Sequence, residues 1–91
     1  MTKVNILVTT KSGAVFMKEF DMPFVPGRDT ELCLTIGDTD HILKVEKVTW
    51  EEKRNLIFVR VNGSKMTESR YPLKDKPNFY FENDPTWTRN R

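Results

Sequence analysis

The chain has 91 residues and a mass of 10.7 kDa, which suits one domain and excludes a two-domain enzyme or a long repeat array. Only 37% of the residues are hydrophobic and 31% are charged, so the core must be small. Fifteen basic against 13 acidic residues leave a net charge of +2, far from a histone-like excess, although the basic residues outnumber the acidic ones by ten to seven after position 45.

Cys33 is the only cysteine, which excludes an internal disulfide and a four-cysteine zinc site. The apolar run Ile6-Leu7-Val8 is too short for the core of a signal peptide. No segment approaches the roughly 20 apolar residues that cross a bilayer. We therefore expect a cytoplasmic protein, in a reducing compartment that suits a lone thiol.

Two strands are predicted at the start of the chain, over Lys3–Thr10 and Ala14–Phe20, because both segments are rich in Val, Ile, Thr and Phe. The three-residue connector Lys11-Ser12-Gly13 ends in glycine, which suits a hairpin whose last loop residue has a positive φ. We therefore expect the two strands to pair antiparallel.

A loop with two prolines follows, from Met22 to Arg28, and we expect Phe24 and Val25 to turn inward and plug one end of the core. Residues Glu31–Ile36 then alternate, with leucine and isoleucine on one side and Cys33 on the more polar side. The alternation predicts a third strand.

A turn over residues 37–40 precedes a fourth strand, His41–Trp50, whose alternation changes phase. Leu43 and Val45 share one parity, whereas Val48 and Trp50 share the other. A slip of one residue turns every following side chain to the opposite face of the sheet, so a bulge or sharp bend is predicted at Glu46-Lys47.

The most apolar segment, Asn55–Val61, is predicted to be the central strand. Asn62-Gly63 is a strong signal for a type I′ hairpin turn, so Ser64–Tyr71 is expected to return as a polar edge strand. A last short strand is expected at Asn78–Glu82, followed by a flexible or lightly docked tail over residues 83–91.

These elements predict an all-β domain over residues 1–82, a small antiparallel meander barrel or strongly bent sheet of about six strands. The core candidates are Ile6, Val8, Phe16, Leu34, Val45, Trp50, Ile57, Val59 and Phe79.

Catalytic signals are weak in this sequence. His41 is the only histidine, and we interpret it as an exposed residue next to a turn; a Cys33–His41 pair lacks an evident third, orienting group. The pair Glu51-Glu52 lies in a predicted surface turn, where burial would not separate the two pKa values. The sequence therefore indicates no enzyme, no metal site and no cofactor.

The last third of the chain combines aromatic and basic residues, which suits either the stacking of nucleic-acid bases or an anchor for a protein partner. Phe79 and Phe81 are expected to close the core, whereas Tyr80 and Trp87 are expected on an exposed strip with the arginines. The candidate binding residues are Arg70, Tyr71, Tyr80, Trp87, Arg89 and Arg91.

The run Pro23-Phe24-Val25-Pro26-Gly27-Arg28, followed by the segments 42–50 and 56–61, resembles small β-barrel proteins of unassigned function in bacteria and phages. The resemblance implies a phage or mobile-element accessory factor. We expect a binding module that engages another protein, as a monomer or a weak homodimer without contact to a membrane. The alternative is a small barrel that binds single-stranded nucleic acid through its C-terminal aromatic and basic residues.

Overall fold

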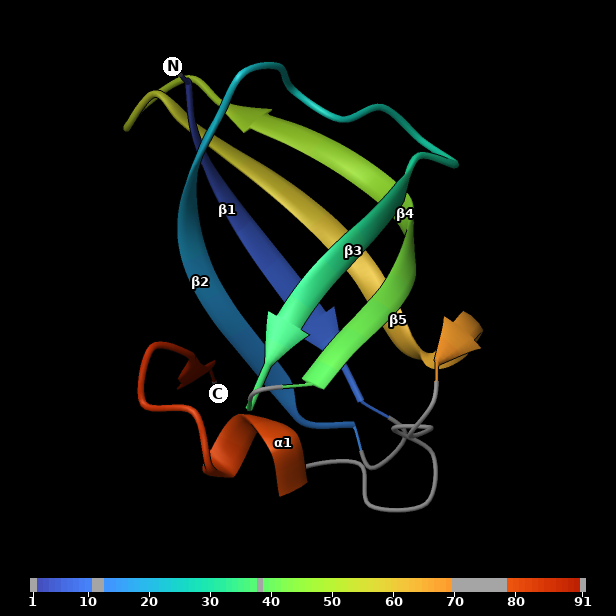
Figure 1. Ribbon diagram of the computed structural model, residues 1–91. Helices are drawn as coiled ribbons and strands as arrows, with labels where there is room; N and C mark the ends of the chain where they lie inside the picture. Colours follow the sequence, from blue (N-terminus) through green and yellow to red (C-terminus); the bar gives the residue numbers. More distant parts are fainter. Residues whose placement is uncertain (1, 11–12, 38, 70–78, 91) are drawn as a thin grey trace.

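The computed structural model describes residues 2–10, 13–37, 39–69 and 79–90, and its strands form one six-stranded sheet in the order β3-β4-β5-β1-β2-β6. Figure 1 shows that the sheet curves around itself into a half-barrel, with α1 at one end. The prediction of an all-β, strongly bent sheet is confirmed. The elements are β1 (Thr2–Thr9), β2 (Val15–Met22), β3 (Glu31–Ile36), β4 (Thr39–Glu51), β5 (Leu56–Ser69), α1 (Phe79–Glu82) and β6 (Thr88–Asn90).

The first hairpin forms as predicted. Strands β1 and β2 pair antiparallel from Thr2 opposite Met22 to Thr9 opposite Val15. Gly13 has a φ of 88°, a left-handed conformation that favours glycine, and its N–H donates to the carbonyl of Thr10 at 2.9 Å.

The path of β5 corrects two predictions. Asn62-Gly63 forms no hairpin turn, because β5 continues through both residues and its far half stays beside β4, with Met66 opposite Leu43. The near half pairs in parallel with β1, from Asn5 opposite Phe58 to Thr9 opposite Asn62. The sheet is therefore mixed rather than an antiparallel meander. Residues 58–61 of β5 pair with both β4 and β1, so the central position expected for Asn55–Val61 is confirmed. The far half, from Met66 to Ser69, continues the same strand and pairs with β4 alone among the described residues.

The predicted bulge in β4 is confirmed. Val45 faces Val61 and Lys47 faces Arg60, so Glu46 is an extra residue in the ladder. A larger irregularity lies in β5 between Val61 and Met66, where the chain carries Asn62-Gly63. A glycine inside a strand commonly marks such a bend, so the turn signal in the sequence became a bulge instead of a hairpin.

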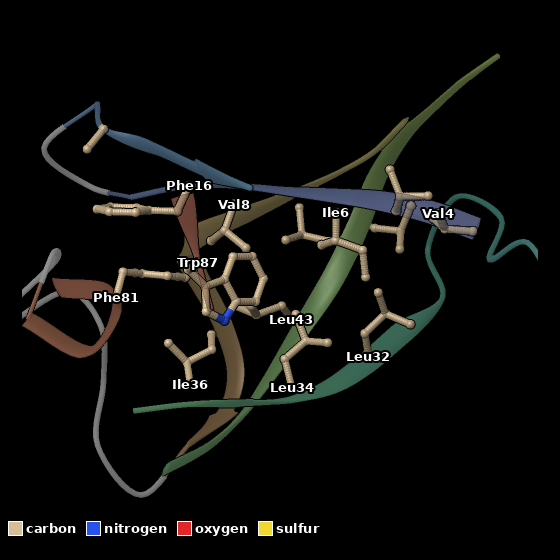
Figure 2. Packing of buried hydrophobic residues seen from close by; sticks show 14 residues of the cluster. Val4, Ile6, Val8, Phe16, Leu32, Leu34, Ile36, Leu43, Phe81 and Trp87 are labelled. Atoms are coloured by element: carbon tan, nitrogen blue, oxygen red, sulfur yellow. The ribbon is translucent and has the colours of Figure 1, made fainter. Parts of the chain in front are cut away.

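One hydrophobic core lies inside the curved sheet (Figure 2). Six of the nine core candidates are buried, and Ile57 packs against this core as a partly buried residue. Trp50 was wrongly assigned to the core, because its side chain is 60% exposed. The side chain of Phe79 falls outside the described part of the chain. The buried candidates are Ile6, Val8, Phe16, Leu34, Val45 and Val59.

The loop between β2 and β3 also differs from its prediction. Phe24 is 52% exposed and Val25 is 41% exposed, so neither side chain plugs the core. Pro26 is the fully buried residue of this loop. Main-chain hydrogen bonds from Asp29 to the carbonyl of Val45 and from Val45 to the carbonyl of Thr30 hold the end of the loop against β4.

The C-terminal segment closes one end of the half-barrel. In place of the expected last strand, residues Phe79–Glu82 form one helical turn, from which Phe81 stacks on Phe16 with ring centroids 4.5 Å apart. Trp87 meets Phe81 edge to face at 5.2 Å and is only 5% exposed (Figure 2). Three residues of β6 then pair with β2. These contacts dock residues 84–90 against the sheet.

Asp84 explains why the chain turns at this point. One carboxylate oxygen accepts hydrogen bonds from the N–H and hydroxyl groups of Thr86, and the other accepts from the N–H of Gly37 at 3.1 Å. The N–H of Trp87 donates to the carbonyl of Asp84 at 3.2 Å. The tail is thereby fastened to the end of β3, and Trp87 is directed into the core.

The two tryptophans test this arrangement. The sequence predicts a buried Trp50 and an exposed Trp87, whereas in the structure Trp87 is buried and Trp50 is exposed. We expect Trp87→Ala to lower the free energy of unfolding by about 3–5 kcal/mol, because it leaves a cavity beside Phe20 and Phe81. Trp50→Ala should cost about 1 kcal/mol or less. Urea denaturation measures both, and Trp87→Phe provides a milder variant that still folds. Equal losses for the two alanine variants would contradict the packing.

Candidate binding surfaces

The outer face of the sheet carries a small pocket where β1, β4 and β5 lie side by side. It has a volume of about 220 Å³ and is lined by Leu7, Lys47, Thr49, Phe58 and Arg60. Successive residues of a strand point to opposite faces, so the pairing of Lys47 with Arg60 and of Thr49 with Phe58 brings these four side chains to one side. Val59, between the two β5 residues, points into the core.

Two cations stand directly opposite each other in this pocket. Lys47 and Arg60 are exposed cross-strand partners, and side chains in such positions have Cβ atoms about 4.5–5.5 Å apart. Like charges in this arrangement repel and destabilise the sheet. Neither cation forms an ion pair with a described residue, so an anion from outside the chain would relieve the repulsion.

Two acids of this outer face already bind other cations. Glu51 receives two hydrogen bonds from the guanidinium of Arg54, at 2.5 and 2.7 Å, and this contact lowers the pKa of the Glu51 carboxyl below its ordinary value. Glu19 pairs with Lys3 at 3.5 Å. These two acids are therefore engaged away from Lys47 and Arg60.

A second surface, which we call the apolar end, lies where β4 finishes and consists of Val48 and Trp50; Phe24 and Val25 are exposed in the loop after β2, at the same end of the fold. All four side chains are large, hydrophobic and exposed. The register places the end of β4, the start of β5 and the end of β2 at the same edge of the fold, which Figure 1 shows at the top.

Strand β4 extends beyond its neighbour at the apolar end. Pairing between β3 and β4 begins at Glu31 opposite Lys44, and the preceding loop adds hydrogen bonds only as far as Val45. From Lys47 to Glu51, β4 therefore pairs with β5 alone among the described residues. Val48 and Trp50 point to the core side of this stretch, but they remain exposed because β3 does not extend over them.

A hydrogen bond holds the indole of Trp50 in place. Its Nε1–H donates to the Oδ1 atom of Asn55 at 2.9 Å, across the turn that joins β4 to β5. Asn55 has a φ of 53°, a left-handed conformation that asparagine tolerates better than most residues. The exposed ring is thus fixed by the turn beside it.

The C-terminal residues selected as binding candidates do not form the expected exposed strip. Trp87 is buried, so its assignment to that strip was wrong. Arg89 is exposed on β6, with its Cζ atom 6.0 Å from the centre of the Phe16 ring. Tyr80 lies in α1, with its side chain outside the described part of the structure; Arg70, Tyr71 and Arg91 also lie outside the described residues.

Neither surface was predicted, although part of the necessary signal is present in the sequence. The change of parity in β4 implies that Lys47 and Thr49 face outward after the bulge, and that Val48 and Trp50 face inward. The register that brings Arg60 opposite Lys47 could not be known from the sequence, because it depends on how many residues the bulge inserts.

Cys33 and His41 lie on neighbouring strands but on opposite faces. Cys33 is exposed on the outer side of β3, as expected, whereas His41 is buried on the core side of β4, opposite Leu34. The expectation of an exposed His41 was therefore wrong. The alternation of two paired strands also separates these side chains, which argues against the nucleophilic Cys–His pair.

Metal ligands do not gather in the described ranges, where no group of three or more His, Cys, Asp or Glu side chains could hold an ion. The one helix of the same residues is far too short to span a bilayer. Comparisons of the chain with protein-family models, with curated proteins and with solved structures found no match.

The burial of His41 predicts a pH dependence of stability. Burial lowers the pKa of His41 from its ordinary value of 6.5, and the negative charge of Asp40 offsets part of the shift. The unfolded chain then binds a proton that the folded chain refuses, so the free energy of unfolding should fall as the pH drops below about 6.5, by at most about 1.4 kcal/mol per pH unit.

Chemical denaturation over this pH range measures the effect. His41→Leu removes the titrating group and should flatten the curve between the ordinary pKa of histidine and the acidic region where carboxyl groups such as those of Glu51 and Asp84 begin to take up protons. An unchanged slope in the variant would refute the assignment.

The opposed cations predict a variant more stable than the natural protein. Arg60→Glu places an acid opposite Lys47, and we expect the free energy of unfolding to rise by about 0.2–1 kcal/mol at low salt. The gain should shrink as salt screens the pair. Lys53→Glu, in the exposed turn after β4, makes the same change of net charge and serves as the control. A variant at Arg60 that is no more stable than this control would show that the repulsion is absent.

Proposed function

We propose that this chain is a non-enzymatic small β-barrel module that binds another protein by pairing with an extended strand of that partner. The observation that carries the proposal is the length of β4, which leaves residues Lys47–Glu51 paired on one side only among the described residues, next to exposed hydrophobic side chains. A strand with an unpaired edge offers a row of backbone N–H and C=O groups to an added strand.

The apolar end supplies the side-chain contacts that such an interaction needs. Backbone hydrogen bonds give affinity in strand addition, whereas pockets and anchors for alternate side chains give specificity. Val48 and Trp50 are two residues apart on one face of β4 and are 38% and 60% exposed. Tryptophan is enriched among the residues that carry most of the binding energy in protein interfaces.

The contact between Trp50 and Asn55 favours binding for a further reason. A side chain that is already held in one conformation loses less entropy when it enters an interface. The charged residues Glu46 and Lys47, together with the bulge, also disfavour indiscriminate pairing of this edge, because charges and bulges are common protections of edge strands. The combination suits one specific partner better than self-assembly into fibrils.

The setting proposed for this module is the cytoplasm, where an exposed thiol such as Cys33 stays reduced. Its proposed origin, as an accessory factor of a phage or mobile element, is supported by the sequence pattern over residues 22–61 alone. The partner is accordingly a protein with an extended segment free of proline, since proline lacks the N–H group that a paired strand donates.

A displayed library of random linear peptides tests the proposal directly. We expect selection on the wild-type protein to recover peptides with alternating apolar residues, and Trp50→Ala to weaken their binding by about 30-fold, the effect of an interface hot spot. Lys53→Ala, in the adjoining turn, should leave the affinity within about twofold of that of the wild-type protein. Proline at a central position of a recovered peptide should abolish binding where alanine does not.

Three results would reject the proposal: no peptide recovered above background, equal binding to the wild-type and Trp50→Ala proteins, or tolerance of proline along the whole peptide. Sedimentation equilibrium adds an independent check. A stable dimer that Trp50→Ala dissociates would mean that a second copy of the chain covers this edge.

A further inference from the structure

We propose that the pocket on the outer face binds single-stranded nucleic acid, one nucleotide at a time. Lys47 and Arg60 would hold a phosphate, Thr49 would donate its hydroxyl hydrogen to a phosphate oxygen, and the ring of Phe58 would stack on the base. This site is separate from the apolar end, because its side chains lie on the opposite face of β4.

The charge of the pocket identifies the ligand as an anion. Two exposed cations oppose each other across β4 and β5, no described acid pairs with them, and the nearby acids Glu51 and Glu19 bind Arg54 and Lys3. Hydrogen bonds from charged donors to phosphate are stronger than neutral ones, and the fork of an arginine fits phosphate oxygens in pairs.

The size of the pocket points to part of a polymer. Its volume of about 220 Å³ is below the roughly 300–1,000 Å³ of sites that enclose a small molecule. A ligand held here is therefore only partly covered, as one unit of a longer chain would be. The basic excess of the second half of the chain adds a long-range attraction for a polyanion.

The apolar part of the pocket favours nucleic acid over an acidic peptide. Phe58 is half-buried beside Leu7, which leaves part of an aromatic ring on an open sheet surface next to the cations. Each nucleotide carries a phosphate and a flat base, so one nucleotide satisfies both halves of the pocket. A run of Glu or Asp would satisfy the cations and leave the ring without a partner.

The sequence also suggests single-stranded nucleic-acid binding, but through residues at the C-terminus. Trp87, the aromatic residue of that group whose side chain is described, packs inside the barrel and is not available for stacking. The outer pocket offers the same chemistry from residues of β1, β4 and β5, on a regular sheet that holds them in fixed register.

Fluorescence anisotropy with a labelled single-stranded oligonucleotide of about ten nucleotides tests this site. We expect binding at low salt that weakens as salt rises. Arg60→Glu should weaken it by about tenfold or more, and Phe58→Leu, which keeps the apolar contact but loses the aromatic face, by about fivefold or more. The matched control Lys53→Glu should change the affinity by less than about twofold.

The controls distinguish a nucleotide site from unfolding and from general attraction between charges. Arg60→Glu is expected to be at least as stable as the wild-type protein, so its loss of binding cannot come from unfolding; a melting curve for each variant checks this. No binding at low salt, or an equal loss for Lys53→Glu and Arg60→Glu, would overturn the proposal. So would equal competition by polyglutamate or inorganic polyphosphate, since neither carries a base. Trp50→Ala should bind the oligonucleotide normally, which keeps this test independent of the proposed protein interface.

Discussion

One extra residue in β4 determines what both surfaces of this protein display. Before Glu46, the odd-numbered residues His41, Leu43 and Val45 face the core; after it, the even-numbered residues Val48 and Trp50 do. Without the bulge, Lys47 would point toward the core and Trp50 would stand on the outer face. The cation pair with Arg60 and the apolar end therefore depend on the same local irregularity. Bulges often lie next to functional sites because they redirect side chains in this way.

The rest of the fold keeps that stretch of β4 in place. The parallel pair of β1 and β5 joins the two antiparallel halves of the sheet, so β5 is supported on both sides where it carries Phe58 and Arg60. At the far end, Phe81 and Trp87 pack against Phe16 and Phe20 of β2 inside the curved sheet, and Asp84 ties their segment to Gly37. A domain of this size has a small core, so these two aromatic rings are a large share of what holds the half-barrel closed.

Much of this architecture followed from local sequence signals, and the errors have physical causes. The first hairpin and the bulge were predictable because loop length, glycine and side-chain parity act locally. The hairpin turn predicted at Asn62-Gly63 was wrong because these residues suit both a turn and an irregularity within a strand. Only the long-range pairing of β5 with β4 decides between the two. The burial of Trp50 and of Trp87 was predicted the wrong way round, because burial depends on which segment covers a strand. The pairing of β3 with β4 ends before Trp50, whereas the turn at Asp84 directs Trp87 into the core.

The two proposed sites share strand β4. The sequence of a bound protein partner would therefore decide whether its binding strengthens or weakens the binding of nucleic acid. A strand added beside Lys47–Glu51 places its own side chains next to Lys47 and Thr49 on the outer face, at the distance of cross-strand neighbours. An acidic side chain next to Lys47 would neutralise part of the phosphate site and oppose nucleic-acid binding; a basic one would reinforce it. Binding energies at linked sites change reciprocally, so nucleic acid would select among partners by the same amount. The free edge of β4 would thus connect the choice of protein partner to the charge of the outer face.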